Sequence, residues 1–359
     1  MILHRRHRLA ANPALLWPVT HVRLFCLLVW CSAALPLLWG CASAPARTKA
    51  AVTGETVRTG TIDTSAHVPR NTTVDTSSLP VLSPASELLI KACDNYLSLN
   101  PESPKIADVL MIKASLYYNN RLFEQSRIAY RQMVEKFPGT PSAIEATKMI
   151  AQGFYEEKQF DSAQVWYRKL STLSGEGVNQ SEAIERIAES IFRSAEQYEA
   201  QLRFKEAAEQ YQRISMEFPD VKIADVALFN AGLCYEKLAE WSRVILTLQQ
   251  LLQKYPESRI VPKAMFRIGI ANAKLLKWDL AAESYLRMVA SYPKSDLAPT
   301  ALYNAGFAFE NANKLAEAAA TFEKMIQLFP QYEDAADILF RAGELYGKLK
   351  NWEAVTRVN

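Results

Sequence analysis

The strongest constraint on the fold is a repeat of 37 residues that is marked by proline. An aromatic residue followed by proline recurs at this interval at Phe218-Pro219, Tyr255-Pro256, Tyr292-Pro293 and Phe329-Pro330. Pro101 and Pro138 keep the same spacing. A fixed period of this length is typical of proteins built from stacked supersecondary units. The interval from Pro138 to Pro219 is seven residues longer than two periods, and we expect these residues to form a longer loop between repeats at Leu173–Ala183.

Small and large residues also recur at fixed places within each repeat. A small residue lies 24 positions before each proline site: Ala114, Ala151, Ala195, Gly232, Gly269, Gly306 and, by extrapolation, Gly343. Three residues later comes a mostly aromatic position: Tyr117, Phe154, Tyr198, Tyr235, Asn272, Phe309 and Tyr346. A second small residue is followed, four positions on, by a large one: Tyr130, Tyr167, Tyr211, Leu248, Tyr285 and Phe322. Spacings of three and four are helical, so the pattern predicts two helices in each repeat.

These residues resemble the tetratricopeptide-repeat family, in which small residues lie where helix A meets helix B and proline closes the unit. The resemblance implies an all-α fold, a right-handed α-α superhelix of about seven helical hairpins. Units are expected to start near residues 107, 144, 188, 225, 262, 299 and 336, with the last one incomplete, in a solenoid over residues 85–359. A capping helix is expected within Ser86–Ser103.

Three residues depart from the repeat pattern. Asn272 replaces an aromatic residue, and Val244 and Val355 replace the second small residue. We expect the corresponding helix pairs to pack a little further apart.

The first 41 residues resemble the signal sequence of bacterial lipoproteins. A basic start (His4–Arg8) is followed by the apolar stretch Leu24–Gly40, which is of signal-peptide length. Leu38-Trp39-Gly40-Cys41 resembles a lipobox, which implies removal of residues 1–40 and attachment of lipid to Cys41. The alternative is an uncleaved anchor with an incidental cysteine. Residues 41–84 are rich in Thr, Ser, Ala and Pro, a composition that predicts a disordered tether.

Composition excludes several function classes. All four histidines precede residue 68, which removes imidazole-based catalysis and the commonest zinc sites from the solenoid. The formal charge of +3 falls to −1 without the four arginines ahead of Cys41, so no basic field indicates nucleic-acid binding. We therefore predict no enzymatic activity, cofactor, metal or small-molecule substrate. Cys93 and Cys234 are predicted to be buried free thiols.

The candidate partner-binding residues lie on the expected A helices, which line the concave face in this family. An aromatic position recurs every 37 residues, and the residue after it alternates between asparagine and arginine: Phe229 and Asn230, Phe266 and Arg267, Tyr303 and Asn304, Phe340 and Arg341. Such a stripe could bind an extended peptide. The alternative is that the aromatics are packing residues. Asn230, Lys263 and Arg267 also match half of a carboxylate clamp, but Phe192 and Glu196 stand where its other half would be.

The resemblance extends to two groups of bacterial envelope proteins with this repeat step, the BamD-like lipoproteins of β-barrel assembly and the YbgF-like partners of the Tol-Pal system. It implies a lipid-anchored scaffold on the periplasmic side of the outer membrane. Such a scaffold would bind protein or peptide partners in outer-membrane protein assembly or envelope maintenance. Two alternatives remain: a lipoprotein of a secretion, pilus or gliding apparatus, and the non-catalytic part of a longer envelope enzyme.

Overall fold

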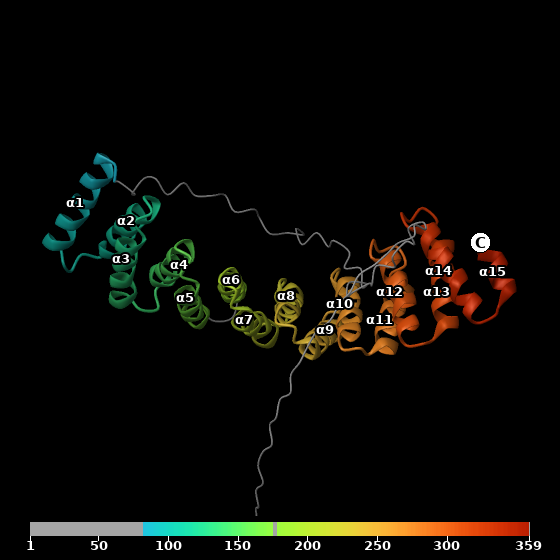
Figure 1. Ribbon diagram of the computed structural model, residues 1–359. Helices are drawn as coiled ribbons and strands as arrows, with labels where there is room; N and C mark the ends of the chain where they lie inside the picture. The colour runs from blue at the N-terminus through green and yellow to red at the C-terminus, as the bar shows by residue number, and fades with distance from the viewer. Residues whose placement is uncertain (1–81, 175–177, 359) are drawn as a thin grey trace, which may run out of the picture. The chain divides into compact units, whose positions relative to one another are not determined.

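The computed structural model describes residues 82–174 and 178–358, and there the secondary structure is entirely α-helical. All of the helices belong to one compact unit (Figure 1). They are α1 (Pro84–Leu99), α2 (Ile106–Asn119), α3 (Phe123–Lys136), α4 (Pro141–Glu156), α5 (Phe160–Leu173), α6 (Val178–Ala200), α7 (Phe204–Glu217), α8 (Ala224–Lys237), α9 (Trp241–Lys254), α10 (Val261–Lys274), α11 (Trp278–Ser291), α12 (Ala298–Asn311), α13 (Leu315–Leu328), α14 (Ala335–Lys348) and α15 (Trp352–Val358). The predicted signal peptide, Cys41 and nearly all of the predicted tether lie outside the described residues.

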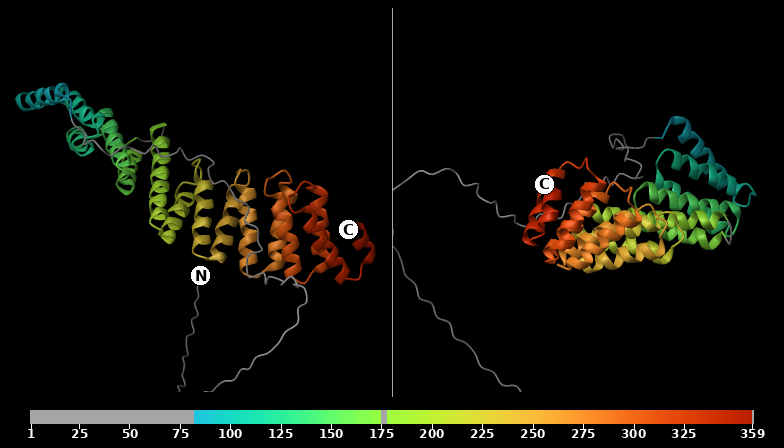
Figure 2. Two further views of the ribbon diagram at one scale, coloured as in Figure 1. Left: turned by 45° about the horizontal axis from the view of Figure 1, so that its top comes forward. Right: turned by 90° about the vertical axis from the view of Figure 1, so that its right-hand side faces the viewer.

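The helices pair into hairpins that stack in chain order, which confirms the predicted fold class. The even-numbered helices from α2 to α14 are the A helices, and each is followed by its B helix. Each helix packs mainly against the helices just before and just after it in the chain. Figure 2 shows this order from two further directions. The helix α1 packs on α2 and occupies the place of the expected cap.

The proline of each repeat ends a B helix through its effect on the preceding residue. Tyr255, which precedes Pro256, is the C-cap of α9 and has φ −130° and ψ 57°. Phe218 and Phe329 cap α7 and α13 with similar angles. Proline disfavours helical dihedrals in the residue before it. The recurring aromatic-proline dipeptide is therefore the stop signal of helix B.

The turn from helix A to helix B is equally regular. One residue in each turn has a positive φ, and none of these residues is glycine: Arg121, Lys158, Leu202, Ala239, Leu276, Asn313 and Lys350. The backbone N–H of Lys277 donates to the carbonyl of Asn272 at 2.9 Å, across the turn that contains Leu276. A left-handed residue with such a bond closes a helix tightly, so helix B begins only a few residues later.

The core lies along the seam between the helices of each hairpin. The small residues of helix A approach the large residues of helix B, as the repeat pattern predicts. A Cβ atom added to Gly269 would lie 2.5 Å from Cε1 of Tyr285, so only glycine fits there. On α3, the Ser126 hydroxyl donates to the carbonyl of Ala114 at 2.9 Å, which joins the two small positions of that hairpin.

The expected loop at Leu173–Ala183 is wrong. The helix α6 begins at Val178 and is the longest of the described helices, with 23 residues. No proline or glycine interrupts the chain after Gly177 until well past this helix. The added turns also bury Ala183 completely. Apolar burial and the lack of helix breakers therefore extend helix A where a loop was expected.

Cys93 and Cys234 are buried free cysteines, as predicted. Burial raises the pKa of the Cys234 thiol, and Glu199 contributes in the same direction. Within the described ranges, every helix is too short or too polar to cross a bilayer.

Candidate protein-binding surface

The nine candidate residues lie on four A helices, but three of them are buried. Phe229 is 7 % exposed, Phe266 is fully buried and Asn304 is 1 % exposed. The Phe266 ring packs on the Tyr285 ring of α11, with their centroids 5.4 Å apart. These three residues therefore serve packing, and the exposed stripe predicted from the sequence is incorrect at their positions.

The remaining candidates are accessible to different degrees. Asn230, Lys263, Arg267, Tyr303 and Arg341 are all partly exposed. The Tyr303 ring packs against Phe322 of α13 at 5.8 Å between centroids, which fixes one side of the ring. We call these five residues the A-helix surface.

Both arginines of this surface are paired with carboxylates of the preceding A helix. Arg267 donates from Nη1 to Glu236 at 2.7 Å, and Arg341 donates from Nε to Glu310 at 2.8 Å. The Arg267 and Glu236 side chains are 16 % and 21 % exposed, so the pair is largely shielded from solvent. Because Glu236 already occupies its guanidinium, Arg267 is poorly suited to grip a free carboxylate. The structure therefore argues against a carboxylate clamp that includes Arg267.

Phe340 differs from its equivalents in the other repeats because it is 63 % exposed. It lines a cleft of about 380 Å³ on α12 and α14, together with Glu310, Asp337, Arg341, Glu344, Leu345 and Lys348. Its equivalent Phe266 packs on helix B of its own repeat, whereas α15, the B helix that follows α14, is described over only seven residues. Its exposure is therefore a property of this end of the stack.

Two family models match the chain, and both describe tetratricopeptide repeats. One matches residues 226–258, which is the hairpin of α8 and α9, and the other matches residues 266–333, which spans α10 to α13. Residues 226–258 and 266–333 are therefore tetratricopeptide repeats. Proteins of this class are typically non-catalytic scaffolds for protein–protein interaction, and the array of helical hairpins has the same architecture.

Three solved structures are similar to parts of this chain at low identity. MamA from Desulfovibrio magneticus RS-1 is 18 % identical, with a TM-score of 0.36 over 48 % of this chain and 92 % of that one. The C-terminal part of a repeat protein from Cytophaga hutchinsonii is 14 % identical, with a TM-score of 0.39 over 71 % and 98 %. YrrB, described as having an unusual peptide-binding site, is 18 % identical, with a TM-score of 0.35 over 58 % and 95 %. No curated protein matches the chain.

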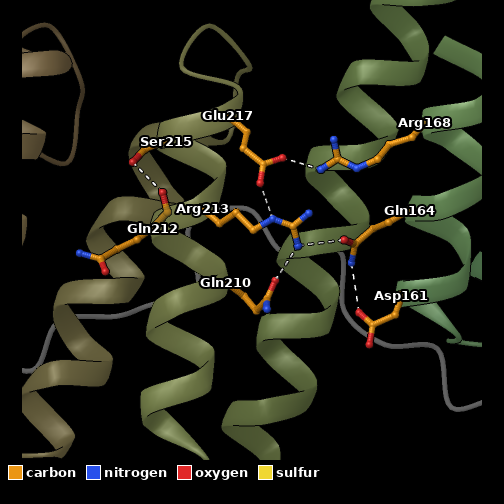
Figure 3. Close-up of polar contacts among 8 residues, drawn as sticks. All are labelled: Asp161, Gln164, Arg168, Gln210, Gln212, Arg213, Ser215 and Glu217. Carbon is orange, nitrogen blue, oxygen red and sulfur yellow. Dashed lines mark hydrogen bonds and ion pairs between the residues drawn. The ribbon is translucent and has the colours of Figure 1, made fainter. Parts of the chain in front are cut away.

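The tetratricopeptide array also contains a polar network that the sequence pattern did not reveal. It joins α5 to α7 across the enlarged repeat (Figure 3). Arg213 donates to the Gln164 amide oxygen at 3.2 Å and also pairs with Glu217, which accepts from Arg168 as well. Burial raises the pKa of Glu217, but the two arginines outweigh it and hold the pKa below its ordinary value. The network links two B helices.

No group of residues in the described array has the composition and geometry to hold a metal ion. A second cleft lies on α9, α10 and α11 around Asn272. In the sequence, this cleft was indicated only by Asn272, which replaces an aromatic residue and which we expected to loosen the packing of that unit.

Proposed function

We propose that this protein is a lipid-anchored scaffold in the periplasm that binds other cell-envelope proteins, in outer-membrane protein assembly or envelope maintenance. The observation that carries the proposal is the uninterrupted stack of hairpins from α2 to α15. Each hairpin packs against the hairpins before and after it and leaves part of its helix surface to solvent. Such an array offers a long contact surface for an extended or helical segment of another protein.

The A-helix surface is the part of the array that we assign to partner binding. It combines a tyrosine, an asparagine and positively charged groups, which are residue types that bind peptide backbone and side chains. Lys263 is the cation of this surface for which no ion pair is found among the described residues, because Arg267 and Arg341 are paired. The surface is therefore weakly positive at α10 and could attract an acidic segment of a partner.

The anchor and the location rest on the sequence alone. Leu38-Trp39-Gly40-Cys41 and the apolar run before it support lipid attachment at Cys41. Acyl chains contribute about 0.8 kcal/mol for each buried CH₂ group, so two or three chains would hold the protein on a membrane. Ala42 follows the cysteine, which by analogy with enteric lipoproteins supports the outer membrane.

Co-purification from detergent-solubilised membranes tests the binding surface. Lys263→Glu reverses a charge on helix A, and we expect it to reduce a specific co-purifying envelope protein at least about tenfold. Lys324→Glu is the matched control, because it makes the same change at an exposed position on helix B of another repeat. Equal recovery of every partner with the two variants would contradict the assignment of the A-helix surface.

Fractionation tests the anchor separately. The Cys41→Ala protein should move from the membrane fraction to the soluble periplasmic fraction, while its array remains folded. A Cys41→Ala protein that stays in the membrane would support the uncleaved anchor instead.

A further inference from the structure

The cleft around Asn272 exists because one repeat lacks the aromatic residue that the others carry. It has a volume of about 530 Å³ and lies on α9, α10 and α11. Met265 and Ile268 form an apolar part of its lining, and both are less than 9 % exposed. A cleft of this size accommodates a side chain or a small ligand.

Two other repeats show what fills the equivalent place. In α8, the Tyr235 hydroxyl donates to Oε1 of Gln212 on the preceding B helix at 2.9 Å. The guanidinium of Arg243, on the following B helix, lies 5.3 Å from the centre of the Tyr235 ring. In α14, the Tyr346 hydroxyl donates to Glu323 in the same way, also at 2.9 Å. A tyrosine ring therefore fits between two successive B helices with its hydroxyl bound to a polar group.

The repeat of Asn272 keeps the surroundings of that ring but not the ring itself. Gln249 and Leu280 lie 37 residues after Gln212 and Arg243, and both line the cleft. Asn272 is 5 % exposed, and its amide is 3.4 Å from the Ser284 hydroxyl, so the short side chain stays at the base of the cleft. Gln249 could therefore accept a hydrogen bond from a tyrosine hydroxyl, and the apolar lining could hold the ring. Asn272 is too short to fill this space itself.

Charges at the edge of the cleft favour an acidic occupant. Lys277, Arg287 and Glu283 line it, which leaves one positive charge in excess. Among the described residues, no ion pair is found for either cation (compare the pairs of other repeats, such as Lys314 with Asp279). Unpaired cations beside an apolar cleft attract carboxylates that flank the inserted group.

We propose that this cleft binds a tyrosine side chain of a partner protein, in a segment where acidic residues flank the tyrosine. The inserted ring would take the place that Tyr235 takes in its own repeat, with its hydroxyl donating to Gln249. The predicted tether is a poor occupant, because residues 42–81 contain no aromatic residue. The proposal rests on the proposed scaffold function but uses a different surface, between B helices.

Methyl NMR on the full-length protein in detergent tests the proposal, with methionine labelled at the ε-methyl carbon. The probe is the peptide acetyl-Glu-Asp-Tyr-Asp-Glu-amide. An inserted ring lies over Met265, so its methyl signal should shift progressively with the peptide while that of remote Met133 stays fixed. The same peptide with alanine in place of tyrosine should give no shift. An unshifted Met265 signal at millimolar peptide would overturn the proposal.

Two variants complete the test. Asn272→Tyr supplies the ring from the chain itself, and we expect it to raise Tm and to weaken peptide binding about tenfold or more. Asn272→Ala keeps the cleft open and should still bind the peptide. If the wild-type protein, Asn272→Tyr and Asn272→Ala all bind the peptide equally, the peptide binds elsewhere and the cleft is not its site. A Met265 shift that depends on protein concentration without peptide would instead indicate a second copy as the occupant.

The scaffold function can fail or hold independently of the cleft. If Asn272→Tyr retains every co-purifying partner while Lys263→Glu loses one, the scaffold stands and the cleft proposal is wrong. If Asn272→Tyr alone loses a partner, the cleft is the binding surface and the A-helix assignment is wrong.

Discussion

At the scale of single residues, the hairpins depend on a small residue of helix A facing a large residue of helix B. Tyrosine is the large residue in four of the repeats, and its hydroxyl commonly finds a polar partner at the far edge of the seam. Tyr167 donates to Gln152 at 2.8 Å, and Tyr211 donates to Glu199 at 2.7 Å. Burial raises the pKa of both hydroxyls, so these tyrosines stay neutral donors. The seam therefore combines a steric fit with a satisfied polar end.

Gly269→Ala tests the steric fit. The new Cβ would lie 2.5 Å from the Tyr285 ring, which is fully buried and cannot move away freely. We expect a loss of about 1–3 kcal/mol in the free energy of unfolding, measured by urea denaturation followed by circular dichroism. Gly347→Ala is the matched control, because nothing lies within 4 Å of a Cβ there. That change should be neutral or stabilising by up to about 1 kcal/mol, and similar losses in both variants would contradict the account.

At the scale of elements, the turns between helix A and helix B carry strain that is repeated along the chain. Leu276 has φ 58° and its side chain is 70 % exposed. A left-handed conformation costs a non-glycine residue about 1–2 kcal/mol, and an exposed leucine recovers little of this through packing. The stop signals themselves were predictable, because the spacing of the prolines marks where each B helix ends. The positive φ in each turn was not predictable, because the residues that adopt it have no common type of side chain.

Leu276→Gly should stabilise the array, since glycine adopts a positive φ without steric cost. We expect a gain of about 0.5–1 kcal/mol after the entropy that glycine loses on folding, measured as a shift in the urea midpoint. Asn313→Gly at the equivalent turn should change the midpoint less, because asparagine tolerates this conformation. A destabilised Leu276→Gly protein would show that the leucine side chain matters more than its backbone angle.

The packing of α14 and α15 on α13 should weaken in acid. Hydrogen bonds from Arg357 lower the pKa of Glu323, which also accepts from the Tyr346 hydroxyl. A carboxyl whose pKa is lower in the folded state stabilises that state above its unfolded pKa of about 4.3, and loses this effect as pH falls through the folded pKa. Amide hydrogen exchange in α14 and α15 should therefore speed up below about pH 4. Glu323→Gln should remove most of this pH dependence of hydrogen exchange. If exchange in the variant responds to acid as in the wild-type protein, ionisation of Glu323 is not the cause.

At the scale of the whole molecule, the fold followed from the sequence more readily than the candidate site. Repeats contact mainly their neighbours, so one periodic pattern is enough to predict every hairpin. The enlarged repeat escaped prediction because seven added residues fit a loop as well as a longer helix, and only the burial of Ala183 distinguishes the two.

Exposure of the candidate residues depends on stacking, which the repeat pattern does not reveal. Phe266 and Phe340 hold the same repeat position, yet only Phe266 is buried, where it packs on Tyr285 of helix B in its own repeat. Asn304 was expected at the surface but is almost fully enclosed. The cleft at Asn272 was partly foreseeable, because a missing aromatic residue in a regular array implies lost packing. Its volume and its charged edge required the structure.

We propose that this array binds an envelope protein while it is anchored to a membrane. Site-specific photo-crosslinking in intact bacteria tests it most directly, with p-benzoylphenylalanine in place of Lys263 and, as a control, of Lys324. The account predicts a discrete protein adduct in the membrane fraction from position 263, none from position 324, and a soluble adduct or none in the Cys41→Ala background. Full-length protein found only in the cytosol, with no adduct from position 263, would contradict it.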